Sequence, residues 1–161
     1  MIPSADTVVP QAREHAWKYF ELHANQRIAV FNFFLVVSGA LSAGIAATLQ
    51  GSQRFALLGV GLGVLLALVA FVFWKLDQRV SFLVKHAESA LAQIEGAFPD
   101  PSLQLFYMEP SKTTAAKKVS GIWGRLWTYG QVFRLLFWAM ALFGATGAIL
   151  CWLRFTGCLV W

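Results

Sequence analysis

The sequence predicts an all-α integral membrane protein with about three transmembrane helices. Of its 161 residues, 58% are hydrophobic and 13% are charged, whereas soluble domains are about 45–50% apolar and about 25% charged. Three runs contain no ionisable side chain: Ile28–Leu49, Phe55–Trp74 and Leu135–Leu153. A helix of roughly 20 apolar residues crosses a bilayer core, so we expect transmembrane helices at 28–49, 55–76 and 131–154.

The residues before the first predicted span form a short lead and then an amphipathic helix, together residues 1–27. We expect this helix to begin near Pro10, because proline suits a first helical turn. Its apolar side chains recur every three or four residues, which is the spacing of one helix face. These side chains are Trp17, Phe20, Ala24, Ile28 and Phe31.

A second amphipathic helix, residues 77–98, is expected to continue the second span without a break until Pro99 and Pro101 end it. Both amphipathic helices lie on the same side of the membrane, and each is unstable if its apolar face meets water. We expect them to pack together as an antiparallel stalk; the alternative is that one lies flat on the membrane. Residues 99–130 connect the stalk to the last span, and 155–161 form a C-terminal tail.

Within this connection, Ser102–Glu109 contains several large apolar side chains and is expected to be an extended segment on the stalk. Positive charge is concentrated on one side of the predicted topology: three Lys or Arg residues precede the first span and seven lie between Lys75 and Arg125, against Arg54 alone in the short connection. The positive-inside rule then places the N-terminus and the long connection in the cytoplasm, and the Gln50–Arg54 turn and the C-terminus on the outer side of the membrane.

The sequence predicts no catalytic residue, metal site or cofactor. It contains no phosphate loop, no paired-cysteine motif and no nucleophile-elbow motif. The three histidines, His15, His23 and His86, are interpreted as ordinary stalk residues, since a metal site needs converging ligands. A membrane enzyme is therefore the weakest of the functions considered.

Polar and small residues in the first span are candidates for pore or subunit contacts. Asn32 lies about one turn inside the span, where a polar side chain must face a partner or water. It either lines a pore mouth or bonds to a neighbouring helix. Small residues permit close helix approach in lipid, and they serve packing within one subunit or homo-oligomerisation. The candidates are Asn32, Ser38, Gly39, Ser42 and Gly44.

A basic and aromatic stretch in the long connection suits two ligands. Lys and Arg beside aromatic rings bind single-stranded nucleic acid, and the same composition suits anionic lipid at the membrane interface. The residues themselves favour lipid. They are Lys112, Lys117, Lys118, Trp123, Arg125 and Trp127.

The segment from Trp17 to Arg27, followed by Phe31-Asn-Phe-Phe-Leu-Val, resembles the opening of small membrane effectors from bacterial anti-phage defence loci. These include SLATT-type proteins and the membrane effector of the Hailong system. The third apolar run departs from SLATT proteins, which typically have two spans. The resemblance implies a pore-forming effector that depolarises the bacterial inner membrane, with the C-terminus in the periplasm. For the Hailong type it further implies control by a partner nucleotidyltransferase and its nucleic-acid product.

We therefore predict a homo-oligomeric, channel-like effector that is activated by a cytoplasmic signal, either nucleic acid or a partner protein. The alternative is a membrane-anchored binding module whose stalk recruits a partner. In that case the spans only tether the stalk, and an unrelated anchor would replace them without loss of function.

Overall fold

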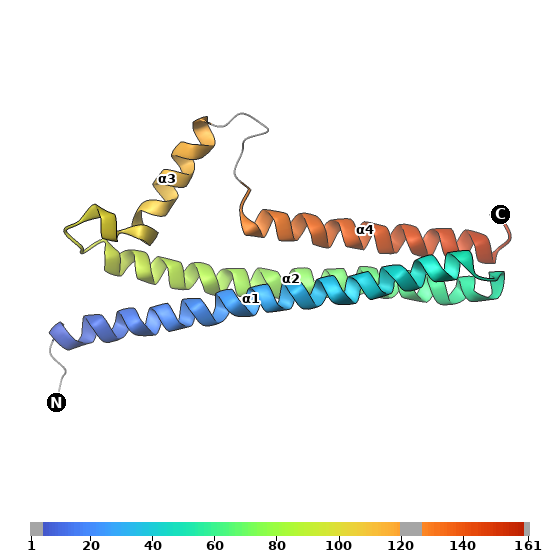
Figure 1. The fold of residues 1–161 in the computed structure, drawn as a ribbon, viewed down its shortest axis with the longest axis horizontal. Helices are drawn as coiled ribbons and strands as arrows, with labels where there is room; N and C mark the ends of the chain where they lie inside the picture. The colour runs from blue at the N-terminus through green and yellow to red at the C-terminus, as the bar shows by residue number, and fades with distance from the viewer. Residues whose placement is uncertain (1–4, 120–126, 160–161) are drawn as a thin grey trace. The chain divides into compact units, whose positions relative to one another are not determined.

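The computed structural model describes residues 5–119 and 127–159, and it confirms the all-α prediction: no β-strand occurs in those ranges. Its helices are, in chain order, α1 (Ala5–Gln50), η1 (Gln53–Phe55), α2 (Ala56–Glu95), η2 (Pro101–Leu103), α3 (Leu105–Val119) and α4 (Tyr129–Phe155) (Figure 1). Three of these, α1, α2 and α4, are long and apolar enough to cross a membrane.

Helices α1 and α2 continue well past their apolar runs, as the unbroken three- and four-residue spacing predicts. The start of α1 differs from the prediction, because the helix begins at Ala5 and Pro10 lies in its second turn. Proline there removes only the hydrogen bond to the carbonyl of Asp6, close to a helix end where such bonds contribute least.

The chain divides into two compact units. The membrane unit contains residues 28–78 and 129–161, and aromatic rings dominate one part of its core. Phe34, Phe133 and Phe137 are buried there with Ala70. Phe31 stacks face to face on Phe133 with 3.9 Å between ring centroids. These rings, supplied by α1 and α4, pack against α2 through Ala70 and hold the three spans together.

Glycines allow α2 and α4 to cross closely elsewhere in the membrane unit. A Cβ atom at Gly63 would lie 2.6 Å from the carbonyl oxygen of Gly144, and a Cβ at Gly144 would lie 2.7 Å from that of Gly63. Such distances leave no room for any side chain. In lipid, where helix association depends on packing, this backbone contact explains why glycine occupies both positions.

Polar contacts tie one end of the membrane unit together. The guanidinium Nη2 of Arg154 donates a 2.7 Å hydrogen bond to the carbonyl oxygen of Gly51, in the turn after α1. The amide of Gln53 donates a 3.1 Å bond to the carbonyl oxygen of Phe155. Gly157, at φ 77°, then ends α4 with a left-handed residue that suits glycine.

The stalk unit contains residues 1–27 and 79–128, so the two amphipathic segments pack with the long connection. The predicted extended segment Ser102–Glu109 is wrong, because the chain forms η2 there and then enters α3 at Leu105. Asp100 caps η2 by accepting a 2.8 Å hydrogen bond from the backbone N–H of Ser102, which lowers the pKa of that carboxyl group.

Candidate functional site

The outer face of α1 is open in the membrane unit. It consists of Asn32, Val36, Gly39, Ala43 and Ala47, spaced three or four residues apart and all exposed. Val36 is 71% exposed, and a Cβ at Gly39 would meet no other atom within 4 Å. Asn32 has no hydrogen-bond partner among the described residues. Apart from Asn32, which carries the one amide group of these five side chains, the set is apolar.

The other candidates in the first span point into the subunit. Ser38 is 1% exposed, and the buried Oγ atoms of Ser38 and Ser42 have no hydrogen-bond partner within the described ranges. A Cβ at Gly44 would lie 3.0 Å from the Leu62 side chain. The five predicted residues therefore do not form one surface: Asn32 and Gly39 face outward, and Ser38, Ser42 and Gly44 face helices of the same chain.

Four glycines of α2 and α4 are accounted for by packing within the subunit: Gly59, Gly63, Gly144 and Gly147. A Cβ at Gly59 would collide with Thr48 and Cys151, and one at Gly147 would lie 2.9 Å from Ile45. Gly61, in contrast, has nothing within 4 Å. Small residues alone thus did not indicate which helix face is open to a second subunit, because glycines occur on both the packed and the open faces.

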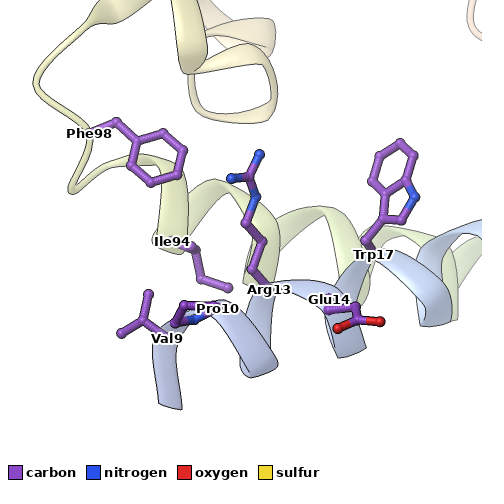
Figure 2. Close-up of a pocket in the computed structure, with 7 residues that line it drawn as sticks. All are labelled: Val9, Pro10, Arg13, Glu14, Trp17, Ile94 and Phe98. Carbon is purple, nitrogen blue, oxygen red and sulfur yellow. The ribbon is translucent and has the colours of Figure 1, made fainter. Parts of the chain in front are cut away.

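The stalk unit contains a groove of about 500 Å³ between the start of α1 and the end of α2 (Figure 2). The guanidinium carbon of Arg13 lies 5.3 Å from the centroid of the Phe98 ring, a cation–π geometry. Nearby Glu14 forms a 2.6 Å ion pair with Lys18. That hydrogen bond, with the positive charge of Lys18, lowers the pKa of Glu14. The rest of the lining is apolar: Val9, Pro10, Trp17 and Ile94.

The histidines lie apart from this groove. His15 and His86 line a second, smaller groove of the stalk, and Nδ1 of His23 lies 2.8 Å from the carbonyl oxygen of Tyr19. Across the residues that the structure describes, no three His, Cys, Asp or Glu side chains come together as metal ligands would.

Glu95 is a structural residue that the sequence did not reveal. Its side chain is 6% exposed, and its Oε2 atom accepts hydrogen bonds of 2.7 Å and 3.2 Å from the backbone N–H groups of Phe106 and Tyr107. It therefore caps the first turn of α3 from the end of α2. The Phe106 ring also packs edge-on against Trp17 and Phe20.

The basic and aromatic stretch is only partly described. Lys112 is exposed on α3, and Trp127 is 59% exposed just before α4. Lys117 and Lys118 belong to α3, but their side chains lie outside the described residues, as do Trp123 and Arg125 altogether. A joint ligand surface for these six residues therefore stays a prediction.

The fold defines the class of protein, an all-α membrane protein: in the described residues three helices are long and apolar enough to span a membrane. No protein-family model matches the sequence, and no solved structure matches it. The chain is similar to CD-NTase-associated protein 19 of Escherichia coli, with 44% identity over 140 residues, which cover 87% of this chain and 88% of the relative.

Identity at this level over nearly the whole of both chains shows common ancestry, and the chain belongs to the family of CD-NTase-associated protein 19. The name of the relative supports the broader resemblance, to proteins of bacterial anti-phage defence loci. The narrower resemblance to SLATT-type or Hailong-type effectors stays a prediction.

Proposed function

We propose that this protein is a membrane effector of bacterial anti-phage defence that assembles as a homo-oligomeric channel and depolarises the inner membrane. Its N-terminus and stalk unit lie in the cytoplasm and its C-terminus in the periplasm. It has no catalytic activity of its own. The signal that opens it arises in the cytoplasm.

The outer face of α1 carries this proposal. An amide group such as that of Asn32 is costly in hydrocarbon unless it finds a hydrogen-bond partner or water. Asn32 has no hydrogen-bond partner in the part of one subunit that the structure describes, although it lies inside an apolar run. Gly39, Ala43 and Ala47 beside it permit close approach of a second helix. A ring of subunits would satisfy the amides by bonding them to one another or to water in a pore.

The similarity to CD-NTase-associated protein 19 supports a nucleotidyltransferase or its product as the activating signal. The name of this relative associates it with a CD-NTase, a nucleotidyltransferase, and such an enzyme joins nucleotides into a nucleic-acid product. We infer that a nucleotidyltransferase is the partner of this chain and that its product, or the enzyme itself, acts on the stalk unit. Exposed Lys112 and Arg13 are cations there that suit a phosphate-bearing ligand.

Membrane potential in bacteria tests the proposal. The protein is expressed alone and then with its neighbouring nucleotidyltransferase, and a voltage-sensitive dye reports depolarisation. We expect wild type to depolarise the membrane in at least one of these conditions, and Asn32→Leu to lose most of that response. Asn25→Leu is the matched control, because Asn25 is also exposed on α1 but precedes the apolar run.

An unchanged potential with wild type in both conditions would contradict the channel. So would equal responses of wild type and Asn32→Leu.

A membrane-anchored binding module is the second candidate, and the stalk groove favours it. A groove of about 500 Å³ with an apolar lining and a cation over an aromatic ring suits the docking of a partner. Replacing the three spans by an unrelated anchor distinguishes the two functions. Protection against phage would survive this replacement in a binding module and would be lost in a channel.

A further inference from the structure

A shallow aromatic crevice lies between α2 and α4 in the membrane unit. It has a volume of about 40 Å³ and is lined by Ala70, Phe71, Trp74, Phe137, Trp138 and Ala141. The two indole rings approach to 5.8 Å between centroids, and Trp138 is 58% exposed. The two alanines leave a small apolar hollow beside the larger rings.

Two cations flank this crevice at the same end of the bundle. The ammonium group of Lys75 lies 4.7 Å from the Trp74 ring centroid and 5.8 Å from that of Phe71. Arg134 precedes Trp138 by four residues and therefore lies on the same face of α4. Both cations are exposed. Neither forms a salt bridge with a carboxylate of the described residues.

The nearest acidic side chain in sequence does not neutralise this end of the crevice. Asp77 is 3% exposed. Two residues along an α-helix correspond to about 200° of rotation, so Asp77 lies on the opposite side of α2 from Lys75. The crevice therefore has an apolar floor and a net positive rim.

The position of Lys75 and Arg134 relative to the apolar runs indicates the kind of ligand. Lys75 directly follows the apolar run that ends at Trp74, and Arg134 directly precedes the run that begins at Leu135. Both cations thus lie at the level of the lipid headgroups, where Trp side chains also gather. Basic sites between membrane helices at this depth suit phospholipid headgroups.

We propose that this crevice is a binding site for one anionic phospholipid. The lipid phosphate binds between Lys75 and Arg134, and one acyl chain lies over the two alanines, against the outer edges of the paired indole rings. The guanidinium group of Arg134 offers paired donors to phosphate oxygens, and Lys75 adds a second charge. This site does not depend on whether the protein is a channel.

Native mass spectrometry of the purified full chain in detergent tests the site, with phosphatidylglycerol as the probe and phosphatidylethanolamine as the zwitterionic comparison. We expect phosphatidylglycerol to bind more tightly. The double variant Lys75→Gln/Arg134→Gln should weaken its binding about thirtyfold, roughly fivefold for each charge lost near a headgroup. Ala141→Leu, which fills the crevice and leaves both charges, should also weaken it.

Two control variants keep the result interpretable. Arg54→Gln removes an exposed cation at the other end of the membrane unit and should leave binding unchanged. Lys75→Arg/Arg134→Lys keeps both charges and should retain it, which separates lost binding from misfolding.

Equal binding of the two lipids would overturn the proposal, as would a loss in Arg54→Gln equal to that of the double variant. Displacement of the lipid by soluble glycerol 3-phosphate would also overturn it, because the site would then recognise a free phosphate without an acyl chain.

Discussion

Neighbouring glycines on α2 differ sharply in their surroundings. Gly63 lies against the backbone of α4, where an added Cβ would be 2.6 Å from the Gly144 oxygen and 2.7 Å from the Ala148 nitrogen. Gly61, two residues earlier and on the other side of the helix, has no atom within 4 Å. One glycine is required by a close approach, and the other is free to change.

Gly63→Ala should therefore destabilise the membrane unit by about 1–3 kcal/mol, the usual cost of overpacking a tight contact. Gly61→Ala should change stability by less than about 1 kcal/mol, because it only alters helix propensity. Thermal unfolding of both purified variants in the same detergent measures the difference. Equal midpoints for the two variants would show that α2 and α4 do not cross at Gly63 and Gly144.

At the scale of elements, the stalk unit contains an acidic group in an unfavourable position. Glu88 is half-buried on α2, outside the apolar runs. Burial raises its pKa, and the charge of Glu109 raises it further, while Lys85 and Arg27 oppose the shift. The folded stalk thus favours the protonated form of this side chain more than the unfolded chain does.

The direction of this shift sets a pH dependence. A carboxyl group with a raised folded-state pKa stabilises the fold below its unfolded pKa, about 4.3 for Glu. That stability is lost as the pH rises through the folded value. Glu88→Gln should accordingly unfold at a higher temperature than wild type at pH 7, and the gain should vanish near pH 4.

Circular dichroism melts of the full chain across this pH range provide the measurement, with Glu21→Gln as an exposed control on α1. A Glu88→Gln variant that is less stable than wild type at pH 7 would contradict the assignment.

The long helices were predictable from sequence, and α3 was not. Apolar runs of membrane-spanning length and unbroken helical spacing are local signals, and they anticipated α1, α2 and α4. The segment Ser102–Glu109, which leads into α3, has several large apolar residues and was expected to be extended. Its helix is stabilised by Glu95, a buried carboxylate on another helix. A contact between distant elements leaves no periodic trace in the sequence.

The same limit applies to the candidate site. The sequence identified Asn32 as polar within a span, and the structure places it on an open face. The sequence did not indicate that Gly39 and Ser38, although adjacent, face different surroundings. One faces outward and the other is buried, because successive residues of a helix lie 100° apart and the orientation of α1 in the bundle depends on α2 and α4.

For the whole molecule, the topology has a direct test in the two cysteines. Cys158 follows α4 and is exposed, whereas Cys151 is fully buried. With the C-terminus in the periplasm, a membrane-impermeant maleimide added to intact spheroplasts should label wild type. Cys158→Ser should abolish the label, and Cys151→Ser should keep it. Labelling that requires permeabilised membranes would reverse the proposed orientation.

The carboxylate of Glu95 makes the formation of α3 depend on α2. Forming the first turn of an isolated helix is unfavourable, and α3 contains Pro110 and many polar residues. The first turn of α3 gains this acceptor only once the end of α2 has formed, so we expect α3 to form after the end of α2. Loss of the Glu95 carboxylate should therefore destabilise the first turn of α3, whose N–H groups would lose their acceptor.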